Sequence, residues 1–258
     1  MKKLFIFLFI LLIISCSLES NKNKIGIVIH GGAGTILKEN MTPELENSYI
    51  IKLEEAVMAG YDILKNGGSS KDAVEQAIRV MEDSPLFNAG VGAVLTNDER
   101  VSLDASFMDG KNLNAGAIAG SSYIKNPISA AIDVMDKSPH VLLSSKGADD
   151  FAIEMGIDTV PNSYFITERR LNSLRRLKDR NNVSFEDPFI KDSKFGTVGS
   201  VAIDIHGNIS AGTSTGGTTN KIWGRIGDVP IIGAGNYANN ECCGISATGW
   251  GEHFIRNV

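Results

Sequence analysis

The pattern of apolar and polar positions changes along the chain: helical spacing dominates the first two thirds, and strand patterns dominate after about residue 197. An uninterrupted apolar run at residues 25–29 predicts a buried strand, which the glycine-rich segment 31–34 ends. Apolar residues at helical spacing predict helices over residues 43–66, 70–81, 127–135, 148–155 and 164–179. Short strands are expected at residues 93–95, 101–108 and 115–119.

The last part of the chain has the pattern of a hairpin. Apolar residues alternate over residues 197–205, a His-Gly-Asn turn follows, and the pattern returns over residues 209–215. A further strand fits residues 244–248, and a helix is expected to start near Glu252. Pro43 and Pro127 fit the first turns of their helices, and Ser70 is the expected cap of the second helix. Hairpins among helices favour an α+β fold with mixed sheets over a doubly wound one.

Composition and the N-terminus narrow the setting. Of 258 residues, 43% are hydrophobic and 21% are charged, and the net charge of −5 argues against a nucleic-acid surface. Two lysines and the apolar stretch 4–14 predict an export signal over residues 1–15. Residues 13–16 are similar to a bacterial lipobox, which implies lipidation of Cys16 and a polar tether over 16–24. We therefore expect a periplasmic, outer-membrane lipoprotein of a Gram-negative bacterium, held to the membrane only by its lipid. A plain secretory signal with an incidental cysteine is the alternative.

One dipeptide is chemically informative. Gly196-Thr197 follows a polar, charged segment and precedes a predicted strand. If the bond between them is cut, the threonine hydroxyl lies beside a free α-amine, a base with a pKa of about 8. An N-terminal threonine with its own amine is a known activated nucleophile. Taken alone, the pair also fits a loop glycine before a strand.

Three further segments carry candidate chemistry. The apolar loop 85–92 could wrap a hard cation with its carbonyl oxygens. Arg225 and Asp228 could hold the carboxylate and ammonium of an amino-acid head group, although a loop ion pair would look the same. Thr248 lies between a strand and a helix, where a hydroxyl and a neighbouring N–H could form an oxyanion hole.

Six motifs occur together and in order. They are His30-Gly31-Gly32-Ala33-Gly34, Pro85-Leu86-Phe87-Asn88-Ala89-Gly90, Gly196-Thr197-Val198-Gly199, Thr213-Ser214-Thr215-Gly216-Gly217, Gly224-Arg225-Ile226-Gly227-Asp228 and Thr248-Gly249-Trp250-Gly251-Glu252. From about residue 25 to its last residue, the chain resembles the plant-type L-asparaginases, also called isoaspartyl peptidases, of the N-terminal-nucleophile (Ntn) hydrolase superfamily. The resemblance implies a four-layer αββα sandwich, self-cleavage into an α subunit (25–196) and a β subunit (197–258), and a dimer of such αβ units.

The same resemblance assigns roles to residues. It implies that Thr197 is the nucleophile released after Gly196, that Thr215 supports it, that Thr248 and Gly249 stabilise the oxyanion, and that Asn88 orients Thr197. The implied substrate-binding residues are Asn88, Arg225, Ile226, Gly227, Asp228, Thr248, Gly249, Trp250 and Gly251. A structural sodium ion would match the carbonyls of Met81, Glu82, Ser84, Phe87, Ala89 and Val91, and no catalytic cofactor is expected.

Two departures from the family pattern bear on these expectations. Family members continue with further core strands after the helix near Glu252, so the β subunit is expected to be truncated and its last strands missing. Trp250 stands where the family usually has a smaller or polar residue, so it is expected to narrow the pocket or to stack on a leaving group.

The implied reaction is hydrolysis of L-asparagine or a β-aspartyl dipeptide through a β-aspartyl ester on Thr197. Two other functions fit parts of the sequence. Ser214 lies in a G-x-S-x-G pattern, and the order Ser214, Asp228, His253 matches that of serine esterases, but too few residues follow it for that fold. A non-enzymatic lipoprotein that binds amino acids through Arg225 and Asp228 is the second, and it predicts no chain cleavage.

Overall fold

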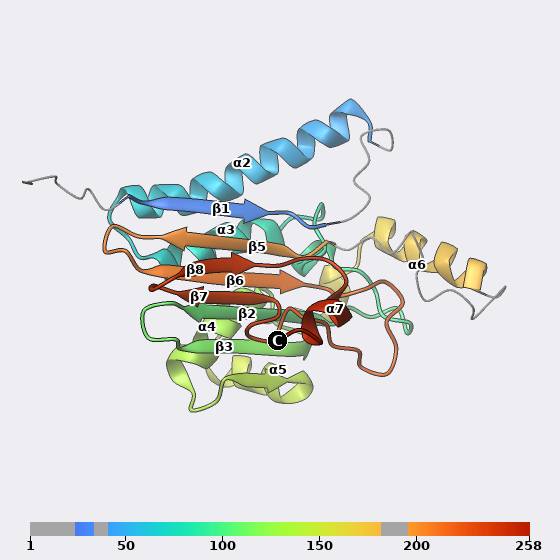
Figure 1. Ribbon diagram of the computed structural model, residues 1–258. Coiled ribbons are helices and arrows are strands. Elements are labelled where there is room, and N and C mark those ends of the chain that lie inside the picture. Colours follow the sequence, from blue (N-terminus) through green and yellow to red (C-terminus); the bar gives the residue numbers. More distant parts are fainter. Residues whose placement is uncertain (1–23, 34–40, 182–195) are drawn as a thin grey trace, which may run out of the picture.

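A twisted six-stranded sheet forms the centre of the molecule (Figure 1). The computed structural model describes residues 24–33, 41–181 and 196–258. The strands run in the spatial order β1 (Gly26–His30), β5 (Val198–Ile203), β6 (Ile209–Thr215), β2 (Leu103–Asp109), β3 (Ala115–Ser121) and β4 (Leu142–Ser144). Neighbouring strands are antiparallel except for the parallel pair β3 and β4.

Layers lie on both faces of this sheet (Figure 1). One face is covered by α2 (Pro43–Lys65), α3 (Ser70–Glu82) and α4 (Pro127–Lys137). The other is partly covered by the hairpin of β7 (Asn236–Asn239) and β8 (Cys243–Ser246), which packs on β2, β5 and β6. The remaining helices are α5 (Ser145–Glu154), α6 (Glu168–Asn181) and α7 (Gly251–Ile255), with 3₁₀ turns η2 (Gly90–Gly92) and η3 (Asn162–Phe165). The prediction of a mixed α+β fold with helices flanking a sheet is confirmed.

Local sequence signals start the helices. Thr42 caps α2 by accepting a hydrogen bond from the Leu45 N–H, and Pro43 occupies the first turn, where its missing N–H costs nothing. In α3 the cap is Ser69, which accepts from the Asp72 N–H, so the expectation that Ser70 caps this helix is wrong. The Ser70 hydroxyl is buried instead, 2.8 Å from the Ser210 hydroxyl of β6, which ties α3 to the sheet.

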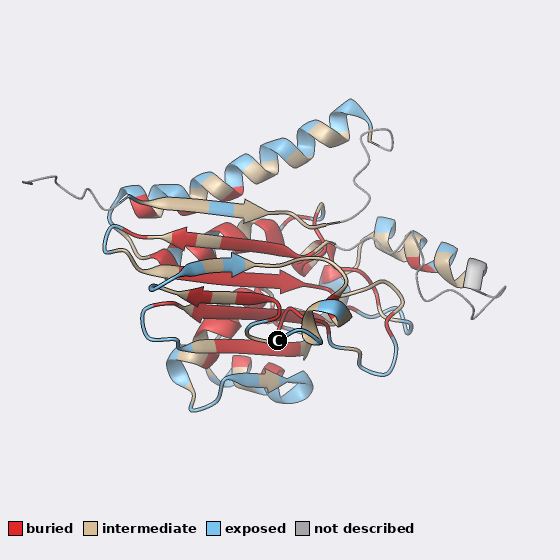
Figure 2. Cartoon of the chain, viewed as in Figure 1, coloured by how far each residue is buried: buried red, intermediate tan, exposed pale blue. Residues whose placement is uncertain are grey.

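The main core lies between the helices and the sheet. Fully buried Ile78 of α3, Phe107 of β2, Ile118 of β3 and Ile128 of α4 pack together there. Each such side chain contributes about 1.5–3 kcal/mol by leaving water. Figure 2 shows the result: β2, β3 and β6 are buried along most of their length, whereas α2 keeps an exposed outer face.

Several expected strands differ from those observed. The strand at 25–29 is an edge strand and not a buried one, because β1 pairs only with β5, and Val28 is 66% exposed. No strand forms at 93–95, where only an isolated bridge joins Leu95 to Val101. The short strands β4 and β7 were not predicted, since each has only three or four residues. The predicted signal peptide, Cys16 and most of the tether lie outside the described residues.

Candidate active site

Three polar side chains, those of Thr197, Thr215 and Asp104, form a row across neighbouring strands at one end of the sheet. β5 and β6 pair with Val198 opposite Ser214, which brings Thr197 beside Thr215. β2 and β6 pair with Asp104 opposite Thr215. The Thr197 hydroxyl donates to the Thr215 hydroxyl at 3.2 Å, and both residues are buried. Strand register therefore places the candidate nucleophile against its candidate supporting threonine.

Thr215 is held by the turn that follows it. The Gly217 N–H donates to the Thr215 hydroxyl oxygen at 3.0 Å, and the Gly217 carbonyl accepts from the Asn88 side-chain amide at 2.7 Å. The Asn88 side-chain oxygen accepts in turn from the Val94 N–H at 2.8 Å. Asn88 therefore reaches Thr197 through Gly217 and Thr215, and every polar atom of its amide group has a partner.

His30 contacts the nucleophile's backbone, a role that the sequence did not assign to it. Its Nδ1 lies 3.0 Å from the Thr197 carbonyl oxygen, and its Nε2 lies 2.7 Å from the Ser246 hydroxyl. Burial lowers the pKa of His30, and the contact with the Thr197 carbonyl opposes that shift, so the ring is neutral at neutral pH. A carbonyl only accepts, so Nδ1 carries the proton, and Nε2 of the neutral ring accepts from the Ser246 hydroxyl, for whose proton the Gly212 carbonyl at 3.2 Å is the competing acceptor. This ring fixes the Thr197 carbonyl.

The loop after β1 lies on the Gly196–Thr197 bond. Gly32 has a φ of +125°, and a Cβ there would stand 2.6 Å from the Gly196 Cα, so only glycine fits. The next residue, Ala33, donates its N–H to the Thr248 hydroxyl at 3.1 Å. The candidate oxyanion donor Thr248 is thus connected through this loop to the bond that would be cut.

The charged residues of the site lie around Arg225. The Arg225 guanidinium contacts one oxygen of Glu252 through Nε at 3.0 Å and through its terminal nitrogen Nη2 at 2.9 Å. Asp228 is 5% exposed, and its Oδ2 has no hydrogen-bond partner among the described residues. Burial raises the pKa of Asp228 to about 6, and Arg225 opposes the shift.

These groups line one small pocket. Its walls include Thr197, Thr215, Arg225, Asp228 and Gly249, together with Gly196, Gly217, Thr218 and Gly227. The volume of the pocket is about 10 Å³, which leaves room for about one water molecule. This is the volume in the uncut chain, in which Gly196 is still bonded to Thr197. Candidate nucleophile, oxyanion-side glycine and head-group residues therefore converge on one point.

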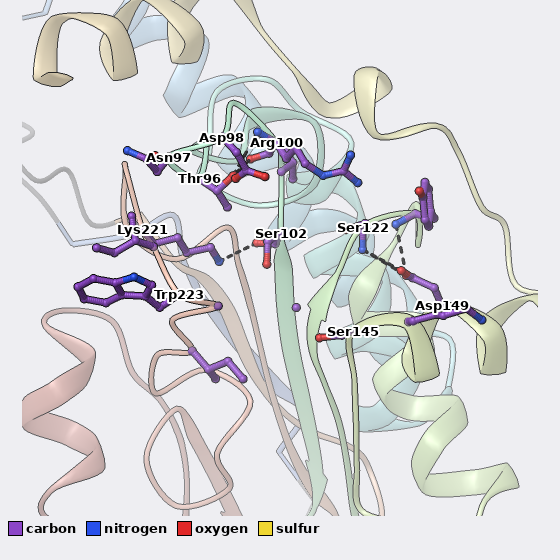
Figure 3. A pocket seen from close by; sticks show the side chains of 17 residues that line it. Thr96, Asn97, Asp98, Arg100, Ser102, Ser122, Ser145, Asp149, Lys221 and Trp223 are labelled. Carbon is purple, nitrogen blue, oxygen red and sulfur yellow. Dashed lines mark hydrogen bonds between the residues drawn. The ribbon is translucent and has the colours of Figure 1, made fainter. Parts of the chain in front are cut away.

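Not every predicted substrate-binding residue lies in that pocket. Ile226 is 42% exposed and lines a much larger cavity of about 830 Å³ (Figure 3). That cavity is lined by Arg100, Asp149, Trp223 and their neighbours, and it contains none of the three candidate catalytic threonines. Trp250 precedes α7 and lines a third hollow with Glu252 and Arg225, whereas Gly251 packs on Asp228, where a Cβ would stand 2.6 Å from Oδ1.

The loop 85–92, which the sequence predicts to hold a cation, packs tightly on neighbouring carbonyl oxygens. Gly90 has a φ of +49°, and a Cβ there would lie 2.2 Å from the Glu82 carbonyl oxygen; one on Gly92 would lie 2.0 Å from that of Phe87. Only glycine fits at these two positions, because a side chain would collide with the carbonyl oxygens. The sodium site itself stays a prediction.

Esterase geometry is absent from the described residues. Ser214 is fully buried on the helix-facing side of β6, and its hydroxyl donates to Glu82 at 2.6 Å. His253 is exposed on α7 beside Arg256. Neighbouring residues of a strand point to opposite faces, so Ser214 points away from Thr215 and from the Asp228 pocket. Ser214, Asp228 and His253 therefore form no triad.

Comparison with known proteins agrees with this picture. Residues 23–258 match the family model described as asparaginase. The isoaspartyl peptidase of Salmonella typhimurium is 46% identical over 239 residues, which cover 92% of this chain and 76% of the relative. The isoaspartyl peptidase of Escherichia coli is 46% identical over 89% of this chain and 73% of its own length, and the human isoaspartyl peptidase/L-asparaginase is 43% identical over 91% and 73%. The chain therefore belongs to the asparaginase family of Ntn-hydrolases and is an amidohydrolase.

Proposed function

We propose that the protein cuts its own chain between Gly196 and Thr197 and then hydrolyses L-asparagine or β-aspartyl dipeptides with Thr197 as nucleophile. The observation that carries this proposal is the small pocket in which the Thr197 hydroxyl, hydrogen-bonded to Thr215, stands beside Arg225 and Asp228. The names of the relatives, isoaspartyl peptidase and L-asparaginase, fit a substrate that has an amino-acid head group and a β-amide.

Self-cleavage requires the Thr197 hydroxyl to attack the carbonyl carbon of Gly196. The hydroxyl proton passes to the peptide nitrogen, the C–N bond breaks, and an ester joins Gly196 to the Thr197 oxygen. Water then hydrolyses this ester, which leaves a carboxylate on Gly196 and a free amine on Thr197. Gly32 and Asn88 pack directly on Gly196, and His30 holds the Thr197 carbonyl, so the reacting groups are oriented before the attack.

The cut chain supplies the base for the second reaction. The new α-amine of Thr197 takes the proton of its own hydroxyl as the oxygen attacks the substrate's β-carbonyl, and it returns the proton to the leaving ammonia or amine. A β-aspartyl ester on Thr197 remains, and water releases aspartate. Thr248 and the backbone at Gly249 would stabilise the negative charge that develops on the carbonyl oxygen.

Recognition of the head group follows from the charges. Glu252 occupies the Nε and Nη2 edge of Arg225, and the third nitrogen, Nη1, makes no hydrogen bond among the described residues. Nη1 lies beside Gly227, where a Cβ would stand 2.8 Å away, so it can reach a substrate carboxylate that no side chain blocks. Asp228, with its unpaired Oδ2, would accept the α-ammonium.

Three further features belong to this proposal. A sodium ion held by carbonyls of the loop that follows α3 would fix Asn88 in place without a chemical role. The chain would act as α and β fragments, and two such αβ units would pair. A lipid on Cys16 would place the enzyme in the periplasm, at the outer membrane.

The first test is the intact mass of the purified protein. Wild type is expected to give two fragments that meet between residues 196 and 197, and to release ammonia from asparagine or aspartate from a β-aspartyl dipeptide. Thr197→Ala removes the hydroxyl and is expected to remain one chain without activity, whereas Thr197→Ser keeps a hydroxyl and is expected to be cut. A single uncut wild-type chain that still releases aspartate would exclude this mechanism.

A further inference from the structure

Next to the candidate site lies a buried ion pair that no step of the proposed reaction uses. Lys221 Nζ stands 3.9 Å from Asp104 Oδ2, and the two side chains are 3% and 1% exposed. Figure 3 shows Lys221 reaching from its loop to the carbonyl of Ser102, with which it makes a 2.9 Å hydrogen bond. Ions buried this completely are expensive unless they are paired, so the pair calls for an explanation.

Asp104 is an incomplete partner by itself. Its Oδ1 accepts from the Gly120 N–H at 2.8 Å, but its Oδ2 has no hydrogen bond among the described residues. The carboxylate lies in the same cross-strand row as Thr197 and Thr215. A negative charge at this position attracts whichever cation is nearest.

Two cations compete for that charge. A Cβ on Gly217 would stand 3.0 Å from Lys221 Nζ and 3.5 Å from Arg225 Nη1, so both cationic groups meet at this glycine. Charge interactions with Asp104 reach Lys221, Arg225 and Asp228. Burial raises the pKa of Asp104 and lowers that of Lys221, and each partner opposes the shift of the other.

The loop that carries Lys221 is fastened independently of the pair. The Asn220 N–H donates to the Leu95 carbonyl at 2.8 Å, the Asn97 N–H donates to the Lys221 carbonyl at 2.9 Å, and the Asn97 side-chain amide donates to the Asn220 side chain at 2.8 Å. The Lys221 backbone is therefore held in place without its ammonium group. The ammonium group is not needed to fix this loop, so we look for its role in the contact with Asp104.

We propose that Lys221 is a positioning residue that neutralises Asp104 and thereby keeps Arg225 free to bind the substrate's α-carboxylate. Without the ammonium of Lys221, the buried carboxylate of Asp104 would draw the Arg225 guanidinium away from the Thr197 pocket. This inference depends on the proposed function, because it assigns Arg225 to a substrate carboxylate.

The test is a double-mutant cycle read as KM and kcat for L-asparagine and a β-aspartyl dipeptide. Lys221→Met is expected to raise KM by about tenfold or more while kcat changes much less, because substrate binding and not the attack is impaired. Asp104→Asn together with Lys221→Met removes both charges and is expected to restore KM to within about threefold of wild type. Asp104→Asn alone is expected to have a smaller effect than Lys221→Met, because it removes the carboxylate that would draw Arg225 away from the pocket.

Lys146→Met is the matched control. Lys146 lines the same large cavity as Lys221, but its side chain is 86% exposed and pairs with Asp150 on α5. Its removal is expected to leave KM at the wild-type value. KM does not depend on how much protein is active, so a pair that only stabilises the fold would lower the yield of cut enzyme and leave KM unchanged in all variants.

The outcomes separate this inference from the proposed function. If the wild type is active and all variants of the cycle have the same KM, the inference about Lys221 is overturned and the proposed function stands. If Lys221→Met fails to fold or to be cut, recovery of both cutting and KM in the double variant supports the inference, and failure of the double variant overturns it. A wild type that is neither cut nor active overturns the proposed function, and the inference falls with it.

Discussion

The two sides of the Thr197 pocket are built from different kinds of groups. On the nucleophile side, hydroxyls, amides and one neutral imidazole satisfy one another: Thr197 donates to Thr215, Gly217 donates to Thr215, and His30 holds the Thr197 carbonyl. On the recognition side the groups are charged and only partly paired. Asp228, Glu252 and Asp104 each retain a buried carboxylate oxygen without a hydrogen bond among the described residues.

This difference indicates what each side does before substrate arrives. A network of neutral, fully bonded groups is fixed in advance, which is what positioning a weak nucleophile requires. Unpaired buried carboxylate oxygens are costly, and a ligand that brings an ammonium group would relieve that cost at Asp228. Changes on the nucleophile side should therefore act mainly on kcat, whereas changes on the recognition side should act mainly on substrate binding.

The largest effect in this comparison is expected from Thr248→Ala. Loss of an oxyanion donor costs about 3–4 kcal/mol of transition-state stabilisation, so kcat should fall by about 10²–10³-fold with little change in KM. The rate of aspartate release is measured per mole of cut protein, with the cut fraction taken from intact mass.

Thr248→Ser is the control for that variant, because it keeps the hydroxyl that accepts from the Ala33 N–H. Thermal unfolding is expected to show both variants folded, since one partly buried hydrogen bond contributes about 0.5–1.5 kcal/mol. Turnover by Thr248→Ala at the parental rate would remove Thr248 from the reaction.

A smaller effect is expected from titration of Asp228. Only its ionised form attracts an ammonium, and burial raises its pKa to about 6. The affinity for the product L-aspartate, measured as a competitive inhibition constant between pH 5 and 7.5, should therefore weaken below about pH 6, by as much as about tenfold per pH unit.

Asp228→Asn tests whether Asp228 causes this pH dependence, because an amide does not titrate. L-aspartate should bind this variant more weakly at pH 7, and its inhibition constant should no longer change near pH 6. The effect on folding has the opposite sign. A carboxyl whose pKa is raised in the folded state favours folding at low pH, and this contribution is lost as pH rises from the unfolded value through about 6. If the inhibition constant of Asp228→Asn still changed near pH 6, that pH dependence would have to come from another group.

The sequence predicted the elements that local signals determine, and it missed those that depend on distant contacts. Helices α2 and α3 follow from their apolar spacing, and α2 also from Pro43 at its first turn, although the cap expected for α3 was wrong. The β5–β6 hairpin follows from its alternation and turn. The burial of β1 could not be predicted, because an edge strand and a central strand can have the same apolar run.

The same distinction holds for the site. Motifs located Thr197, Thr215, Arg225 and Asp228, which the fold brings to one pocket. The contacts of Glu252 with Arg225 and of Lys221 with Asp104 were not predicted, since they join residues 27 and 117 positions apart on separate elements. The sequence shows only that Glu252 and Lys221 lie in or near motifs. Spacing along the chain does not identify Arg225 and Asp104 as their partners.

The smallest effect on activity is expected from Ser214→Ala, which compares the two faces of β6. Ser214 lies next to Thr215 in sequence, but its hydroxyl donates to Glu82 on the helix side of the sheet. Burial raises the pKa of Glu82 to about 8, and the Ser214 hydroxyl opposes that shift. Removing the hydroxyl takes away one of the two hydrogen bonds of Glu82 Oε1, which still accepts from the Ile128 N–H at 3.0 Å. The free energy of unfolding should therefore fall by about 0.5–1.5 kcal/mol, while kcat and KM of the cut enzyme stay at wild-type values. Denaturant unfolding and aspartate release measure the two effects separately, and Thr213→Ala, on the same face as Thr215, serves as the comparison. A loss of kcat in Ser214→Ala with unchanged stability would mean that the helix side of β6 takes part in the reaction.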